Sequence, residues 1–157
     1  MTAKEYLRQL PLFDMKIQQK VNERNDLMLM ATCTGSLGMD PNKVQTSIAG
    51  DKMSEAVSKY VDKEAEINQM IDEYVDLKDK IINEIHQLTD VRYVELLYLR
   101  YVPDVQTHRV KRLEEIACIM KRTDGEPYSF DHIARLHGQA LEDFGEKVLG
   151  CHSNAKL

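Results

Sequence analysis

Long apolar runs are absent from this sequence, and cysteine, proline and aromatic residues are scarce. No stretch reaches the about 18 consecutive apolar residues that a membrane-spanning helix requires, so we expect no membrane span. The segment Met-Thr-Ala-Lys-Glu at residues 1–5 lacks the apolar core of a secretory signal, so no signal peptide is expected. Three cysteines, far apart and without a Cys-x-x-Cys pair, exclude a disulfide framework and suit a reducing compartment. We therefore expect a cytoplasmic protein.

Catalytic and metal-binding motifs are also absent. The sequence contains no Gly-x-Gly-x-x-Gly, no phosphate-binding Gly-Lys-Ser/Thr and no Gly-x-Ser-x-Gly. His132 and His137 are five residues apart, which places them on different faces of a helix, and Cys151-His152 lies in a terminal tail. The acidic residues of 62–84 alternate with lysine, which predicts a solvated helix exterior rather than paired catalytic carboxylates. We expect no enzyme activity, no metal and no cofactor.

The residues that are present predict an all-α protein, because apolar positions recur at helical and not at strand spacing. Thr2 to Glu5 is typical of a capping box. Pro11 interrupts the pattern that follows, so either the helix kinks there or a fresh helix starts near it. We favour the second, with a short lead-in and then a helix from about Pro11 to Thr32. Residues 33–50 contain three glycines and a proline, which favours a mobile surface loop; the alternative is a segment that becomes ordered on a partner.

The next pattern is a seven-residue repeat that predicts a long helix from Asp51 to Leu88. Val61, Val75 and Ile82 widen its apolar face, so more than one neighbour must pack against it. We expect an antiparallel helical hairpin over residues 1–89 that forms a homodimer or a higher oligomer. The repeat residues expected to mediate oligomerisation are Met53, Tyr60, Ile67, Tyr74, Ile81 and Leu88.

Residues 90–150 predict a separate three-helix module, followed by a tail at 151–157. Asp90 is a good N-cap for a helix over 91–102, and a basic linker over 103–112 follows it. Two short amphipathic segments, 113–120 and 129–141, are separated by a polar turn, and the small Ala117 allows them to cross closely. Their expected apolar stripes are Ile116, Ile119 and Met120 on the first, and Ile133, Leu136, Ala140 and Leu141 on the second. This pattern is typical of a helix-turn-helix.

Charge is distributed unevenly along the chain, whose net charge is −5. Residues 1–90 carry 11 Lys and Arg against 16 Asp and Glu, whereas residues 91–157 carry 10 of each. Within 91–122 there are seven basic and four acidic residues. A local excess of positive charge favours contact with a phosphate backbone, but an excess of this size predicts weak binding by a monomer.

The residues Tyr98-Leu-Arg-Tyr-Val102, then Leu-Glu-Glu-Ile-Ala, then Ser129 and the helix ending Arg-Leu-His-Gly-Gln-Ala-Leu resemble region four of bacterial sigma factors. With the N-terminal Thr-Ala-Lys-Glu-Tyr-Leu and Asp-Lys-Met at 51–53, most of the chain resembles a family of small phage and prophage proteins of Gram-positive bacteria. These are ArpU-like, sigma-like regulators of late transcription. The resemblance implies an all-α fold in which a long antiparallel hairpin precedes a sigma-region-four-like helix-turn-helix.

The resemblance also implies contacts to double-stranded DNA. It assigns base edges to Phe130, Asp131, His132 and Arg135, with Ser129 on a phosphate. Phosphate contacts are further expected from the nearby cations Arg109, Lys111, Arg112, Lys121 and Arg122. The sequence departs from the family pattern in a longer turn over 121–128, a longer linker over 103–112, and acidic Asp124, Glu126 and Asp131 beside the expected phosphates.

The function implied is a sequence-specific DNA-binding regulator in the cytoplasm of a bacterial host. Two alternatives remain open. One is a DNA-packaging subunit similar to a small terminase, since such subunits also combine a helix-turn-helix with oligomerising helices. The other is an interaction protein that binds RNA polymerase or a host factor through the long helix and the 33–50 segment.

Overall fold

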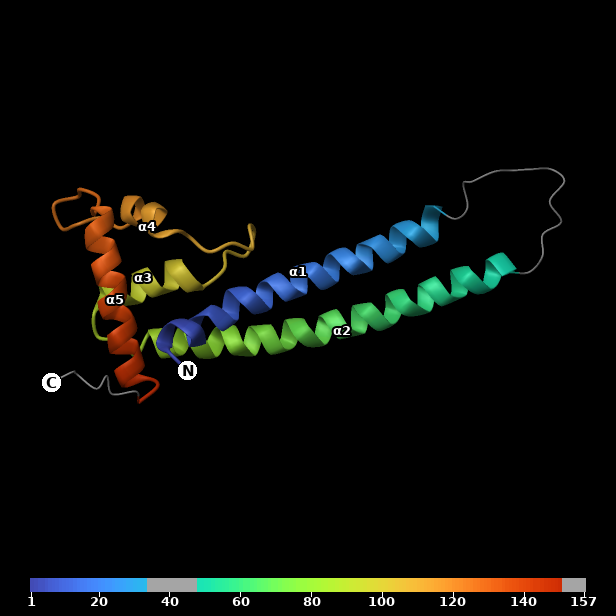
Figure 1. Cartoon of the computed structure of the whole chain (residues 1–157), viewed down its shortest axis with the longest axis horizontal. Helices are drawn as coiled ribbons and strands as arrows, with labels where there is room; N and C mark the ends of the chain where they lie inside the picture. Colours follow the sequence, from blue (N-terminus) through green and yellow to red (C-terminus); the bar gives the residue numbers. More distant parts are fainter. Residues whose placement is uncertain (34–47, 151–157) are drawn as a thin grey trace. The chain divides into compact units, whose positions relative to one another are not determined.

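A computed structural model describes residues 1–33 and 48–150, which fold into five helices joined by turns and loops (Figure 1). The helices are α1 (Ala3–Cys33), α2 (Ile48–Ile85), α3 (Val91–Tyr101), α4 (Leu113–Ile119) and α5 (Phe130–Lys147). No strand occurs in these ranges, so the all-α prediction is confirmed. The chain divides into two compact units. One contains Met1–Asp14 together with the chain from Tyr74 onward, and the other contains Met15–Glu73.

Helix α1 begins at the expected capping box but does not break at Pro11. The Thr2 amide donates to Glu5 at 2.8 Å, and the Glu5 amide donates to the Thr2 hydroxyl at 3.3 Å. The prediction of a fresh helix near Pro11 is wrong, because one helix runs through that residue. A proline inside a helix costs about 3 kcal/mol. Leu7 and Leu10 are both fully buried, and such burial contributes about 1.5–3 kcal/mol each, which is enough to keep the helix continuous.

Helix α2 begins and ends three residues before the predicted limits, at Ile48 and Ile85. Residues 86–88 form a turn, and Asp90 then caps α3 by accepting from the Arg92 amide at 2.9 Å, as expected. The predicted loop over 33–50 falls largely outside the described residues, but Cys33 and residues 48–50 are helical. The tail at 151–157 also lies outside them.

In the unit formed by residues 15–73, segments of α1 and α2 lie side by side in opposite directions. The order of their ion pairs establishes this: Lys20 with Glu66 at 3.1 Å, Glu23 with Lys63 at 2.6 Å, and Arg24 with Glu64 at 3.9 Å. Ile17 and Ile67 are buried in this unit. Exposed ion pairs contribute little stability, so burial of these apolar residues is the stronger contribution.

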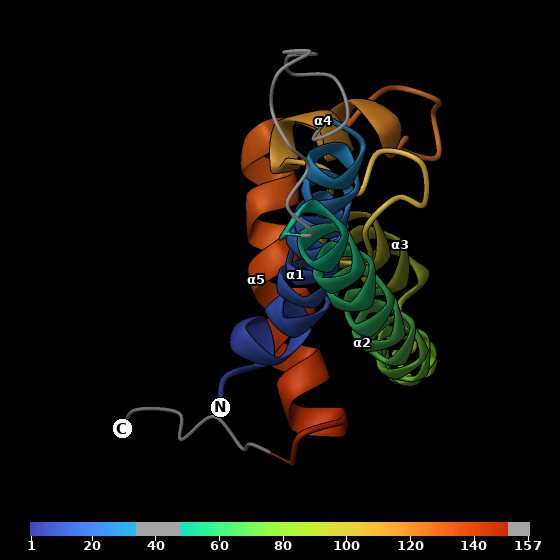
Figure 2. The same cartoon turned by 90° about the vertical axis from the view of Figure 1, so that its right-hand side faces the viewer.

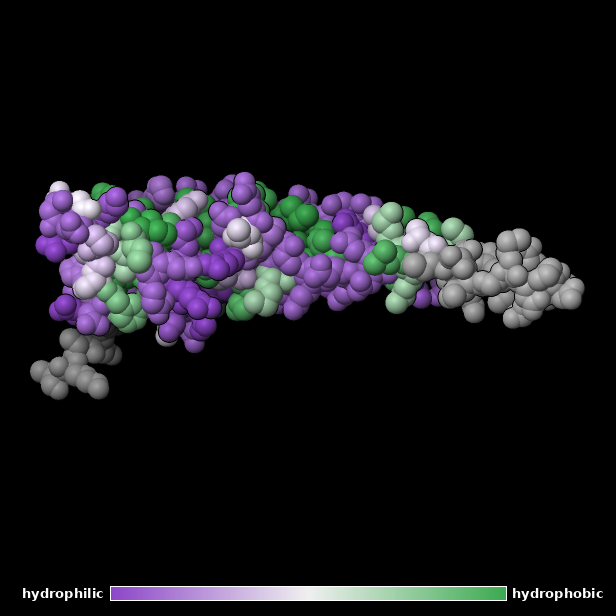
Figure 3. Space-filling model, turned by 90° about the horizontal axis from the view of Figure 1, so that it is seen from above, coloured by the Kyte–Doolittle hydropathy of each residue, from purple (hydrophilic) through white to green (hydrophobic). Residues whose placement is uncertain are grey.

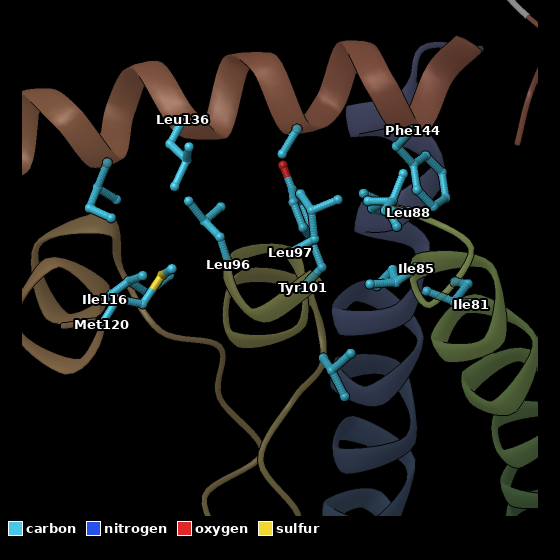
Figure 4. Close-up of a cluster of buried hydrophobic side chains, with 14 of the residues drawn as sticks. Ile81, Ile85, Leu88, Leu96, Leu97, Tyr101, Ile116, Met120, Leu136 and Phe144 are labelled. Carbon is cyan, nitrogen blue, oxygen red and sulfur yellow. The ribbon is translucent and has the colours of Figure 1, made fainter. Parts of the chain in front are cut away.

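The other unit has a continuous apolar core to which all five helices contribute (Figure 4). Helix α5 supplies one side of it and faces α3 and α4, with the ends of α1 and α2 beside it (Figures 2 and 4). The fully buried residues are Leu7, Leu10, Ile81, Ile85, Leu96, Leu97, Ile116, Ile133, Ala140 and Phe144. Two residues that were expected in the apolar stripes of these helices are not fully buried. Ile119 is 44% exposed, because the core face of the short α4 is formed by Ile116, Ala117 and Met120, and Leu141 is half-buried.

The long turn between α4 and α5 folds back on itself. Lys121 and Pro127 form an isolated antiparallel bridge, and the Arg122 amide donates to the Glu126 carbonyl at 2.8 Å. Gly125 closes the turn with a φ of +85°, a conformation that favours glycine. The Tyr128 amide lies 3.4 Å from the Met120 carbonyl. The extra residues therefore form a small loop whose two ends, Met120 and Tyr128, lie next to each other.

Alanine substitutions at two glycines in this module should have opposite effects on stability, because the backbone conformations at the two sites differ. A Cβ added at Gly125 or at Gly138 would meet nothing within 4 Å, so only backbone conformation distinguishes the two sites. Gly138→Ala, inside α5, should raise the free energy of unfolding by about 0.5–1 kcal/mol. Gly125→Ala should lower it by about 1 kcal/mol, because alanine is strained at positive φ. Urea unfolding of both variants measures the difference, and equal effects of the same sign would contradict the turn geometry.

Candidate nucleic-acid interface

The first two turns of α5 present polar and aromatic side chains on one face and apolar ones on the other. Ser129 caps the helix by accepting from the His132 amide at 3.3 Å, as its sequence position predicts. Ile133 is fully buried, whereas Phe130 is 47% exposed and Asp131 and Arg135 are also exposed. The arginine Nε lies 3.4 Å from the Asp131 carbonyl oxygen, a contact too long to hold the guanidinium firmly.

His132 differs from the other expected base-contacting residues, because its side chain is half-buried. Its ring stacks on Tyr128 with centroids 4.9 Å apart and planes inclined by 11°. The Nε2 atom is enclosed and has no hydrogen-bond partner within the described part of the chain. His132 therefore supports Tyr128 rather than projecting outward. Tyr128 was not among the residues expected at this site, although an aromatic residue just before a helix cap is a detectable signal for such packing.

Cations at the turn form the group nearest the start of α5. Lys121 and Arg122 are both exposed. Arg122 lies 3.4 Å from Asp124, whose carboxylate also accepts from the Glu126 amide at 3.1 Å. The acidic residues noted in the sequence thus partly neutralise this arginine, and Lys121 has no ion pair with any residue in the described ranges.

The other expected cations, Arg109, Lys111 and Arg112, precede α4 and so lie at the opposite end of that helix. Its seven residues separate the two groups by about 10 Å at 1.5 Å per residue. Arg109 forms an ion pair with Glu115, which also accepts from the Arg112 amide at 2.7 Å. That backbone bond, followed by the hydrogen bond and the charge of Arg109, lowers the pKa of Glu115. Arg109 and Lys111 line an open hollow of about 410 Å³ that also includes Asp104, Glu115 and Ile119.

The linker before α4 is an ordered turn. The Asp104 carboxylate accepts from the amides of Gln106 and Thr107 at 3.0 and 2.9 Å. His108 adopts a φ of +53°, which is unusual for a residue with a side chain. Its Nδ1 lies 3.2 Å from the carboxylate of Asp14, which is 5% exposed. The sequence pattern did not indicate this long-range pair, which fixes the turn carrying Arg109 to α1.

The residues expected to mediate oligomerisation occupy different environments. Ile67, Ile81 and Leu88 are 2%, 0% and 6% exposed, so the chain's own packing already covers them. Tyr60 and Tyr74 are half-buried, and Met53 is 56% exposed. An interface between copies through Ile67, Ile81 and Leu88 would require the chain to unpack.

In comparisons with known proteins, no family model, no curated protein and no solved structure matches the chain. Among residues 1–33 and 48–150, no helix has the length and apolar character needed to cross a membrane. The same ranges contain no cluster of three or more His, Cys, Asp or Glu side chains that could hold a metal ion.

His137 is a half-buried titratable residue of α5. The ring of His137 stacks on Tyr101, and its Nε2 is hydrogen-bonded to the tyrosine hydroxyl at 3.0 Å. Burial, followed by the charges of Arg100 and Lys4, lowers the pKa of His137 from 6.5 to about 4. The folded protein therefore holds a neutral imidazole between pH 4 and 6.5, whereas the unfolded chain takes up a proton in that range.

This difference predicts a loss of stability as the pH falls. The contribution of His137 to the free energy of unfolding is fully present above pH 6.5. It declines by about 2 kcal/mol toward pH 4, after allowance for the partial exposure of the side chain. The variant His137→Gln does not titrate but keeps an acceptor for the Tyr101 hydroxyl, so its stability should vary less over the same range. Unfolding free energies measured from pH 4 to 7 test this, and parallel pH profiles for the two proteins would contradict it.

Proposed function

We propose that the chain is a DNA-binding protein in which α4 and α5 act as a helix-turn-helix and the N-terminal turns of α5 enter the major groove. The observation that carries the proposal is the division of α5 into two faces. Ile133 and Leu136 are buried in the core, while Phe130, Asp131 and Arg135 are exposed at the capped end of the helix. A recognition helix requires this arrangement, since base edges are reached from its N-terminal residues.

The geometry of the turn supports the same proposal. A helix-turn-helix needs its two helices joined over a short distance, and the turn over 121–128 is long in sequence. Because Tyr128 and Met120 lie next to each other, the excursion between them does not lengthen the connection through the core. Buried Ala117 on α4 is small enough for the close packing of α4 and α5.

Exposed cations flank the proposed groove-facing helix. Lys121 at the turn and Arg112 before α4 are exposed, and Arg135 lies on the helix itself. Arg109 and Arg122 are paired with Glu115 and Asp124, so each contributes less charge to a phosphate. Few unneutralised cations predict weak binding by a single copy, and two copies on half-sites spaced by whole DNA turns, about 34 Å each, would strengthen it.

We propose late transcription in a phage or prophage as the process regulated, because the sequence resembles sigma-like regulators of that process. A packaging subunit is the rival with DNA as a partner. The size of the assembly distinguishes the two: a dimer favours regulation, and a ring of eight or more chains favours packaging. A protein that shifts no DNA at low salt but captures RNA polymerase would instead favour the interaction protein.

Arg135 should determine sequence preference, because a guanidinium can donate two hydrogen bonds to guanine. Arg135→Ala should lower affinity for the selected site by about 5- to 150-fold, corresponding to 1–3 kcal/mol, and remove the preference. Arg135→Lys is the matched control, since it keeps the charge but not the paired geometry. It should retain affinity for random DNA and lose selectivity. Selection from random duplexes followed by titration measures both, and an unchanged preference in Arg135→Ala would refute this contact.

Lys121 and Arg122 should instead contribute sequence-independent affinity. The double variant Lys121→Ala with Arg122→Ala should weaken binding to all duplexes and make the slope of log K against log salt shallower by up to about 2. The control is Lys16→Ala with Lys59→Ala, which removes two charges from α1 and α2. A slope that changes equally in both double variants would show that net charge, rather than the turn, governs binding.

A further inference from the structure

Helix α2 carries a second apolar face that the chain's own packing leaves exposed. Val57, Val61, Ile71 and Val75 are 51%, 54%, 40% and 48% exposed. They are distinct from the repeat that contains buried Ile67 and Ile81. Figure 3 shows that apolar side chains lie exposed among hydrophilic ones on one face of the surface. Four large aliphatic residues at about half exposure on one helix are a candidate interface.

The spacing of this second face is that of a coiled-coil seam. Positions 57, 61, 64, 68, 71 and 75 are separated alternately by four and three residues, which keeps them on one stripe of a supercoiled helix. The two central positions are polar, Glu64 and Asn68. Asn68 is exposed, and Glu64 lies at 3.9 Å from Arg24. Polar residues in such a seam disfavour any register that places them against apolar side chains or like charges.

Only some registers give Glu64 and Asn68 a polar partner in the seam. A parallel pair places each residue against its own copy, so two Glu64 carboxylates meet in the seam. An antiparallel pair with its two-fold axis beside residue 66 places Val61 against the partner's Ile71 and Val57 against the partner's Val75. It also places Glu64 against the partner's Asn68, where the carboxylate can accept a hydrogen bond from the amide. Shifting that pair by one heptad sets Val61 against the partner's Lys78 and Glu64 against the partner's Val75.

We propose that a second copy of the chain covers this face in the antiparallel register centred on residue 66, with the Glu64–Asn68 pair occurring twice at its middle. Apolar layers lie on either side of the polar pair, which selects the register. The pairing does not depend on DNA binding.

Cysteine cross-linking tests the register directly in the full chain with Cys33, Cys118 and Cys151 replaced by serine. The variant carrying both Val61→Cys and Ile71→Cys should form a covalent dimer on mild oxidation, and so should a mixture of the two single variants. Each single variant alone should not, because identical positions lie about 15 Å apart along the pair, beyond the reach of a disulfide. A dimer formed by either single variant alone, or no dimer in the double variant, would overturn the proposal.

Sedimentation equilibrium without DNA tests the energetics. Val61→Glu should raise the dimer dissociation constant by at least about thirtyfold, since it alters both Val61–Ile71 contacts of the symmetric pair. Gln69→Glu adds the same charge on the same helix outside the seam and should change the constant by less than about threefold. Val61 is exposed within the chain, so thermal unfolding followed by circular dichroism should show both variants folded. A wild-type chain that stays monomeric, or a Val61→Glu dimer of unchanged affinity, would refute the pairing. Loss of DNA binding alone would leave it intact.

Discussion

Burial of the inner face of α5 is the constraint on which the rest of the C-terminal module depends. Ile133, Leu136, Ala140 and Phe144 pack against α3, α4 and the ends of the two long helices, and each is between 0% and 4% exposed. With four such positions fixed, the helix cannot rotate about its axis without exposing Ile133, Leu136 and Phe144, whose burial contributes about 1.5–3 kcal/mol each. Phe130, Asp131 and Arg135 are therefore held outward by the packing on the opposite side of the same helix.

Two smaller features adapt the connections to this packing. The turn between α4 and α5 returns to its starting point through the Lys121–Pro127 bridge, so its length does not separate the helices. The linker before α4 is held by Asp104 and by the contact of His108 with buried Asp14. Residues 1–14 and the end of α2 belong to the same compact unit as α3, α4 and α5. The expected boundary near residue 89 thus lies within a single core.

Local signals in the sequence predicted the helices and their caps. The predictions failed where contacts between residues far apart in the chain decide the structure. The caps at Thr2, Asp90 and Ser129 were predictable because each depends on a neighbouring amide. Pro11 misled the prediction, because propensity does not include the burial of Leu7 and Leu10. His132 was expected to face outward, but helical spacing alone cannot show that Tyr128 stacks on its ring. The seven-residue repeat predicted an apolar face correctly, yet periodicity cannot distinguish an intramolecular partner for Ile67 and Ile81 from another copy.

We propose that duplex DNA contacts the N-terminal turns of α5. It is tested most directly by following the backbone amide resonances of the full chain by NMR as a duplex is added at low salt. We predict that the largest shifts cluster at residues 121–122 and 129–135, whereas the amides of Leu136, Ala140 and Phe144, whose side chains are buried, change little. Shifts confined to α1 and α2, or none at saturating DNA, would contradict it.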